Sequence, residues 1–221
     1  MVALGFVQLM VLEVTLALQP VVLLICGGMH PPSYTGQILA TVAQDQGLSQ
    51  LSEVVCVPGS LGVLSPFALR QTLENHLDST VLASSTLEGV APALVIWAFS
   101  AGCVGAAALA THWQRHRGSV LALFMVDGWG VPRDPGVPTY RLSHDAFTHG
   151  TSRWLGAGDL DFYAEPAVPH LTLWRQPQMV TGWATESGGQ RQRLSAADFL
   201  CQRSQAAIHR YQARGQSFTI S

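Results

Sequence analysis

The sequence predicts a compact α/β fold in which a mainly parallel β-sheet carries helices on both faces. Two observations support this prediction. Continuous apolar runs rich in β-branched residues, typical of strands buried on both faces, alternate along the chain with helical patterns. Strands and helices in this rhythm imply right-handed crossover connections, which leave successive strands parallel. The 221 residues are expected to form a single domain.

The first expected strand is Val21–Cys26, a continuous apolar run that stops at a Gly-Gly pair. A helix over residues 34–46 should follow it. The second strand is Glu53–Val57, which ends at a Pro-Gly turn. A second helix is expected to begin at Ser65, because serine before proline is a helix-start signal.

The third and fourth strands lie on either side of the central helix in the sequence. Residues 93–97 are apolar throughout and lead through Ser100 into an Ala-rich helix that should end near residue 116. Val120–Val126 is the fourth strand, and it stops at Asp127, where a loop rich in Gly and Pro begins. Parallel sheets bind ligands beyond the carboxyl ends of their strands, so Ser100 and Asp127 are both expected at the functional edge.

The last part of the chain is expected to contain two short strands, over residues 171–174 and 180–184. A terminal helix should follow, with Ser195 capping its start. Between residues 131 and 170 no strand is evident, and the segment is rich in turn formers and aromatic residues. It is therefore expected to form an irregular cap or lid over the carboxyl edge of the sheet, within the single domain 1–221.

Composition excludes several classes of function. The chain has twelve Arg and no Lys, which excludes a Schiff-base lysine, a pyridoxal-phosphate anchor and a phosphate-loop lysine. A formal net charge of -2 does not suit nucleic-acid binding, which needs a basic surface. Charged residues make up only 12% of the chain, against about 25% in average proteins. A covered hydrophobic patch, as in a homo-oligomer, is therefore expected.

Cysteine usage and the N-terminal segment bear on localisation. The four cysteines lie singly, without disulfide-type or metal-type spacing, which suits free thiols in a reducing cytoplasm. Residues 1–44 hold a single charge, Glu13, so a membrane or signal segment is the alternative. The start lacks a positive charge, and Gln19 and Pro20 interrupt the apolar run before the ~20 residues that span a bilayer. A buried strand or helix is therefore expected there, without membrane contact.

Ser100 carries the functional prediction. It lies between an apolar run and a helix of small residues, in the segment Ala98-Phe99-Ser100-Ala101-Gly102. A serine on a sharp strand-to-helix turn has the geometry of a nucleophile elbow, and small residues on either side let the backbone turn that tightly. The alternative is a buried serine at an ordinary turn.

The motif Ala98-x-Ser100-x-Gly102, within this order of strands and helices, resembles the α/β-hydrolase superfamily over roughly residues 21–211. Alanine replaces the first glycine of the family's pattern, and its small size permits this. The resemblance implies an oxyanion hole made by two backbone N–H groups. One belongs to Ala101, and the other to the loop after an earlier strand, here at Met29. A plain tight turn is the alternative for that loop.

Two segments are also similar to those of uncharacterised hydrolase-like proteins of cyanobacteria: Asp127-Gly128-Trp129-Gly130 and Ser143-His144-Asp145-Ala146-Phe147-Thr148-His149. The superfamily places the acid and the base after the nucleophile. Asp127 is the expected acid, and a cap on the Gly128 turn is its alternative role. Residues 184–195 hold no histidine, so the expected base is His149, with His144 and His30 in reserve. Four other histidines are expected to be structural: His112, His116, His170 and His209.

The leading hypothesis is a serine hydrolase that cleaves an ester or thioester through an acyl-enzyme on Ser100, with a small-molecule acyl or ester substrate and no cofactor. Aromatic residues suggest an acyl or aromatic group in that substrate: Trp129, Phe147, Trp154, Phe162 and Tyr163. The competing hypothesis is a non-catalytic binding or assembly protein of the same fold with an incomplete triad. A metal site formed by the three candidate histidines with Asp127 and Asp145 is a further alternative, but the spacing of these residues matches no metal motif, so no metal is expected.

Overall fold

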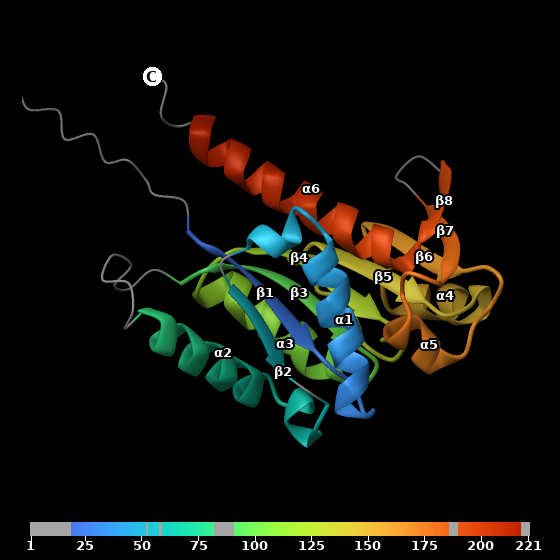
Figure 1. The fold of residues 1–221 in the computed structure, drawn as a ribbon, viewed down its shortest axis with the longest axis horizontal. Coiled ribbons are helices and arrows are strands. Elements are labelled where there is room, and N and C mark those ends of the chain that lie inside the picture. The colour runs from blue at the N-terminus through green and yellow to red at the C-terminus, as the bar shows by residue number, and fades with distance from the viewer. Residues whose placement is uncertain (1–18, 52, 58, 82–90, 186–189, 218–221) are drawn as a thin grey trace, which may run out of the picture.

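The computed structural model describes residues 19–51, 53–57, 59–81, 91–185 and 190–217, and Figure 1 shows its fold. The strands are β1 (Val21–Cys26), β2 (Glu53–Val57), β3 (Ala93–Phe99), β4 (Val120–Val126), β5 (Thr139–Ser143), β6 (Leu160–Ala164), β7 (Thr181–Thr185) and β8 (Arg191–Ser195). The helices are α1 (Pro32–Gln44), α2 (Pro66–Val81), α3 (Gly102–His116), α4 (Ala146–Ser152), α5 (His170–Arg175) and α6 (Ala196–Ser217).

All the described strands belong to one sheet of eight, in the order β2-β1-β3-β4-β5-β6-β7-β8. The pairs from β2 through to β6 are parallel, whereas β7 and β8 pair in antiparallel fashion. Helices pack on both faces (Figure 1). The predicted fold class is therefore confirmed.

Strand β1 shows why the sheet is covered on both sides. All six of its residues are buried, and successive side chains point to opposite faces. Leu23 and Ile25 belong to the core that includes α1 and α6. Val22 and Leu24 belong to the core that includes α2 and α3. An apolar side chain at every position is thus what a strand between two helical layers needs.

The segment 131–170 is not the irregular cap that was expected, because it supplies β5 and β6. β5 pairs in parallel with β4 and β6, and β6 pairs in antiparallel fashion with β7 on its other side. Each carries a buried charged residue, Arg141 in β5 and Asp161 in β6. The Arg141 guanidinium donates to the carbonyl oxygens of Gly156 and Val131, each at 2.8 Å. A charge within a strand interrupts the apolar run by which buried strands are recognised.

Residues 171–174, expected as a strand, form most of helix α5 instead. Pro169 precedes the helix, and its fixed φ suits a helix start. Leu173 and Trp174 are buried in the core on the side of α1. The strand expected over residues 180–184 is confirmed as β7, and β8, which follows, was not expected because its side chains are mostly polar and exposed.

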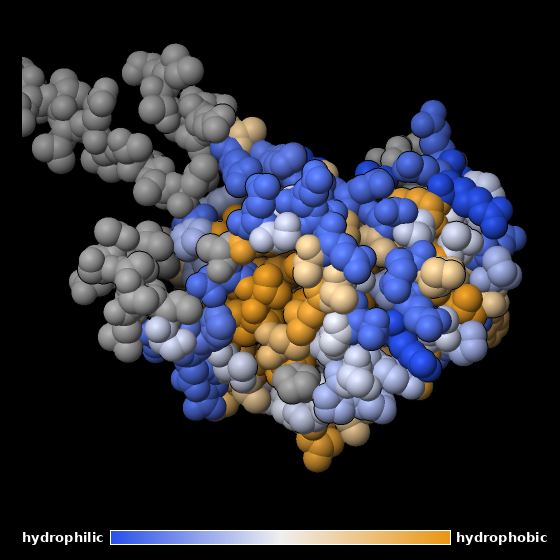
Figure 2. Space-filling view, viewed as in Figure 1, coloured by the Kyte–Doolittle hydropathy of each residue, from blue (hydrophilic) through white to orange (hydrophobic). Residues whose placement is uncertain are grey.

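Hydrophobic side chains reach the surface over β1 and β2, beside α1, as Figure 2 shows. The partly exposed apolar residues of this region are Leu51, Val54 and Cys56. β2 is an edge strand of the sheet. The expected homo-oligomer stays a prediction.

None of the helices within the described ranges is long and apolar enough to cross a bilayer. Residues 1–18, expected to form a buried strand or helix, lie outside the described residues.

Candidate active site

Ser100 stands on the turn between β3 and α3, so the predicted strand-to-helix junction is present. Its φ of 51° lies in the left-handed region, which a residue with a side chain adopts at an energetic cost and which is concentrated at functional sites. The Ser100 N–H donates to the carbonyl oxygen of Val126 at 2.8 Å. A Cβ on Gly102 would lie 2.3 Å from the carbonyl oxygen of Gly27. Glycine is therefore required where α3 begins against the end of β1.

His170 is the histidine that contacts Ser100. Its Nε2 lies 3.1 Å from Ser100 Oγ, and its Nδ1 lies 2.8 Å from Asp127 Oδ2. The imidazole stacks on Phe99, with ring centroids 4.8 Å apart, and Phe99 in turn stacks on Trp174 at 5.2 Å. This stack fixes the plane of the imidazole. The side chain is nevertheless 40% exposed, so the edge between Ser100 and His170 is open to a ligand.

Asp127 directly follows β4, and its side chain is completely buried. Its φ of 52° is also left-handed, and its N–H donates to the carbonyl oxygen of Leu142 at 2.8 Å. Oδ1 accepts the backbone N–H of His144 at 2.9 Å. Oδ2 lies 3.0 Å from His144 Nδ1, in addition to its contact with His170. These partners satisfy a carboxylate that would otherwise be costly to bury.

The loop after β1 lies directly beside Ser100. A Cβ on Gly28 would lie 3.1 Å from the Ser100 Cβ and 2.8 Å from the carbonyl oxygen of Phe99. Among the described residues, the backbone N–H groups of Met29 and Ala101 make no hydrogen bond. One of these N–H groups belongs to the residue after Ser100 and the other to the residue after Gly28, which is compatible with the expected oxyanion hole.

His149, expected as the base, does not contact Ser100. It lies in α4, its ring stacks on Tyr163 at 5.1 Å, and its Nδ1 is buried without a hydrogen-bond partner. Burial lowers the pKa of His149 below its ordinary value, so the imidazole is held in its neutral form. The fold therefore brings His170, expected to be structural, to the position expected for His149.

The two reserve histidines lie near the site without touching the hydroxyl. His144 follows β5 and contacts the Asp127 carboxylate. Its Nε2 faces Asp145 Oδ2 at 3.3 Å, and Asp145 also caps α4 by accepting the N–H of Thr148. The His30 Nδ1 lies 2.8 Å from the carbonyl oxygen of Pro31. Of the three histidines considered for the base, only His144 is bonded to another residue of the site.

The position of His170 depends on a strand that sequence reasoning misses. His170 follows β6, the last strand of the parallel part of the sheet. The resemblance to the α/β-hydrolase superfamily implies a histidine late in the chain. Without β6 in the predicted sheet, its expected place is the loop after residues 180–184, which holds no histidine. The alternation of Leu160, Phe162 and Ala164 with other residues is the signal that could have found this strand.

Cys103 lies beneath the turn of Ser100 and is fully buried. Its Sγ donates to the carbonyl oxygen of Ala98 at 3.3 Å. Burial raises the pKa of the Cys103 thiol, and only the thiolate is a strong nucleophile. The nucleophilic candidate at this junction is therefore the Ser100 hydroxyl.

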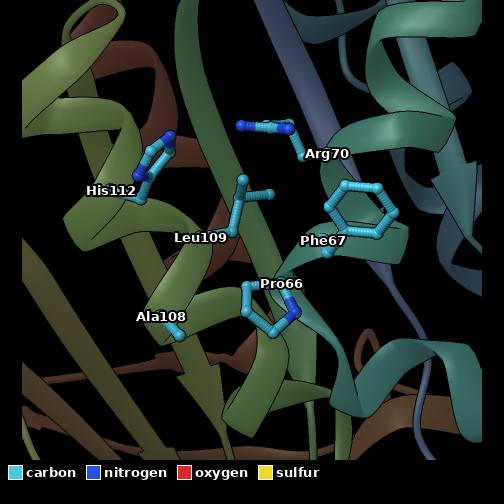
Figure 3. Close-up of a pocket in the computed structure, with 6 residues that line it drawn as sticks. All are labelled: Pro66, Phe67, Arg70, Ala108, Leu109 and His112. Carbon is cyan, nitrogen blue, oxygen red and sulfur yellow. The ribbon is translucent and has the colours of Figure 1, made fainter.

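Two of the surface hollows among the described residues are relevant to the site, although neither is lined by Ser100. Figure 3 shows an open hollow of about 230 Å³ between α2 and α3, lined by Pro66, Phe67, Arg70, Ala108, Leu109 and His112. It runs between the helices and includes none of the residues around Ser100. A second hollow, of about 590 Å³, includes Ala146 and Ala167. It is closer to the site, because the N–H of Val168 donates to the carbonyl oxygen of His144.

Within the described ranges, one group of residues that could hold a metal ion lies at this edge, since Asp127, His144 and His170 offer ligand atoms within 4.8 Å of one another. No protein-family model matches the sequence, and no curated protein is significantly similar to it. The function of the site therefore has to be argued from its own geometry.

Proposed function

We propose that this chain is a serine hydrolase of the α/β-hydrolase superfamily, which cleaves an ester or thioester through an acyl-enzyme on Ser100. The observation that carries the proposal is the hydrogen-bond path from the Ser100 hydroxyl through both nitrogens of His170 to the buried Asp127 carboxylate. The chain order Ser100, Asp127, His170 is that of the superfamily. The left-handed turn at Ser100 adds further support.

In the proposed reaction, His170 is the general base. Its Nε2 accepts the hydroxyl proton while Ser100 Oγ attacks the acyl carbon, and Asp127 stabilises the imidazolium that results. The N–H groups of Met29 and Ala101 hold the oxyanion. His170 then gives its proton to the leaving alcohol or thiol as the C–O or C–S bond breaks. Water then attacks the acyl carbon while His170 Nε2 accepts its proton. His170 returns that proton to Ser100 Oγ as the bond between Oγ and the acyl carbon breaks, which releases the carboxylic acid.

The expected acyl or ester substrate is supported by apolar side chains around the site. Exposed hydrophobic residues adjoin its members in the sequence. Met29 follows the loop glycine beside Ser100, Trp129 lies two residues after Asp127, and Leu171 follows His170. Of the remaining aromatic residues, Phe147 and Trp154 are exposed, whereas Phe162 and Tyr163 are buried and belong to the protein interior. An acyl chain that lies on Met29, Trp129 and Leu171 would cover apolar surface, which favours binding.

A fluorophosphonate probe on the purified protein tests the proposal without knowledge of the substrate. Covalent labelling is expected across pH 6 to 9, and Ser100→Ala should abolish it. An ester series with acyl chains of increasing length then measures the substrate preference. We expect kcat/KM to rise with chain length and Trp129→Ser to flatten that rise. Wild-type protein that stays unlabelled over the whole pH range would rule the proposal out.

The competing function is a non-catalytic binding protein of the same fold. The reason to consider it is that no histidine follows the last strand, which would leave the triad incomplete. The contacts of His170 with both Ser100 and Asp127 weaken this reason, because they supply a histidine after β6. The labelling experiment separates the two functions directly, since a binding protein needs no reactive hydroxyl.

A further inference from the structure

Three ligand atoms of the kind that transition metals prefer meet next to the proposed nucleophile. The Nδ1 atoms of His144 and His170 approach the same Asp127 oxygen, at 3.0 and 2.8 Å. All three ligand atoms lie within 4.8 Å of one another. They come from the ends of β4, β5 and the start of α5, so no local sequence spacing reveals the cluster.

We propose that Asp127, His144 and His170 form a reversible binding site for a divalent transition-metal ion such as Zn²⁺, and that the bound ion switches off the chemistry of Ser100. Two histidines and one carboxylate, with a further position left for water, are a common ligand set for such ions. Metal–ligand bonds of about 2.0–2.1 Å in a tetrahedral site put ligand atoms ~3.3 Å apart. The two contacts to Asp127 therefore need to lengthen by only a few tenths of an ångström, while the two histidine nitrogens draw together.

The outer nitrogens of both histidines already have partners that suit metal binding. A histidine that binds a metal through one nitrogen usually donates its other N–H to an oxygen, which orients the ring. His144 Nε2 lies 3.3 Å from Asp145 Oδ2, and His170 Nε2 lies 3.1 Å from Ser100 Oγ. Each ring is thus supported on the side away from the cluster.

Charge and access also favour a cation here. Asp127 and Asp145 are both acidic, and in the described part of the chain their ion pairs are with His144 and His170 alone. No arginine therefore competes with an ion at the salt-bridge distance. The Asp127 side chain is buried, but those of His144 and His170 are 24% and 40% exposed, so an ion and a water ligand can enter from solvent.

The position of the ion explains why it would inhibit. An ion at His170 Nδ1 uses the lone pair of that nitrogen, so the proton of the neutral ring moves to Nε2. Nε2 then donates toward Ser100 Oγ and has no lone pair with which to accept the hydroxyl proton. This inhibition rests on the proposed hydrolase function, whereas binding of the ion does not.

Titration of the full-length protein with Co²⁺ tests binding by a visible d–d absorption spectrum. We expect a saturable signal at one ion per chain, and Zn²⁺ should displace it. His144→Phe should weaken binding at least tenfold, and Asp145→Asn by about 10 to 100-fold through loss of ring support. His112→Ala is the matched control, because His112 and His116 pair elsewhere, on α3, with ring centroids 5.0 Å apart. It should leave the Asp127 site signal unchanged.

Fluorophosphonate labelling with and without Zn²⁺ tests the inhibition. Zn²⁺ should slow labelling of the wild type and of His112→Ala. For His144→Phe, the ratio of the labelling rate without Zn²⁺ to the rate with Zn²⁺ should return toward one. Ser100→Ala should still bind Co²⁺. A wild type without a saturable Co²⁺ signal, or a signal that both His144→Phe and Asp145→Asn retain in full, overturns the site. A protein that binds Co²⁺ but never reacts with the probe refutes the hydrolase proposal and leaves the metal site standing.

Discussion

Replacement of His170 by alanine is the most direct perturbation of the proposed mechanism. The change removes the Nε2 contact to Ser100 and the Nδ1 contact to Asp127. It also removes the ring that stacks on Phe99. Ser100, its left-handed turn and the neighbouring N–H groups stay in place, because none of them depends on His170 for a backbone hydrogen bond.

The expected loss of reactivity is much larger than the expected loss of stability. A positioned general base contributes about 10² to 10⁴-fold to a rate, which corresponds to about 3–5 kcal/mol of barrier. The His170 side chain is 40% exposed. Its hydrogen bonds and aromatic contact therefore contribute about 1–3 kcal/mol to folding at most. His170→Ala should fold, and it should react far more slowly.

The assay is the second-order rate constant of fluorophosphonate labelling, with urea unfolding of each variant to show that it folds. His149→Phe is the matched control, because His149 is also a histidine of this half of the chain but makes no contact with Ser100. We expect a drop of at least 100-fold for His170→Ala and little change for His149→Phe. Equal rates for His170→Ala and the wild type, or a large loss confined to His149→Phe, would refute the assignment of the base.

Three further outcomes follow from the structure. Gly102→Ala should destabilise the fold by about 1–3 kcal/mol through overpacking, because its Cβ would lie 2.3 Å from a carbonyl oxygen. The Cβ added by Gly36→Ala in α1 has no neighbour within 4 Å, so this substitution should stabilise the fold by about 0.5–1 kcal/mol. Urea unfolding that finds Gly102→Ala more stable than Gly36→Ala would contradict the close contact at Gly102. His149 has its pKa lowered by burial, so only the unfolded state takes up its proton as the pH falls through the ordinary value of 6.5. The neutral imidazole therefore destabilises the wild type as the pH falls below that value, whereas phenylalanine at this position binds no proton. The free energy of unfolding of His149→Phe should rise relative to that of the wild type between pH 7.5 and 5.5. A difference that stays constant over this range argues against a buried neutral imidazole. Burial raises the pKa of all four thiols, but Cys56 is only half-buried; a disulfide reagent on native protein at pH 8 should modify Cys56 first, and rapid modification of the Cys56→Ser variant would show that the other thiols are accessible.

The strands that were predicted with the bounds of the structure are strands without a buried charged side chain. Val21–Cys26 and Val120–Val126 were expected with the bounds that the structure has, because apolar residues fill their positions on both faces. β5 and β6 were not, because Arg141 and Asp161 stand within them. Arg141 is satisfied by the carbonyl oxygens of Val131 and Gly156, ten and fifteen residues away. A local pattern does not contain such partners.

The residues of the site also differ in whether a local sequence signal could reveal them. Ser100 and Asp127 were predicted because each directly follows an apolar strand, which is a local signal. His170 was not, because its contacts reach 43 residues back to Asp127 and 70 back to Ser100. The alternation of Leu171 and Leu173 after it favours a strand, although Pro169 before it suits the helix that the structure has. The assignment of His170 needed the position of β6, and therefore the three-dimensional sheet.

The positions of Ser100 and Asp127 depend on how neighbouring strands are aligned, because the backbone N–H of each residue bonds to the next strand of the sheet. Ser100 donates to the last carbonyl of β4, and Asp127 donates to the carbonyl of Leu142 in β5. Each turn is therefore held by the neighbouring strand, and a single-residue deletion within β4 would displace the carboxylate and remove the acceptor of Ser100 together. The segment that follows Asp127 is held by β5 as well, because the Arg141 guanidinium donates to the carbonyl oxygen of Val131. A change in the alignment of β4 and β5 would therefore disturb the hydroxyl, the carboxylate and the segment after the carboxylate together.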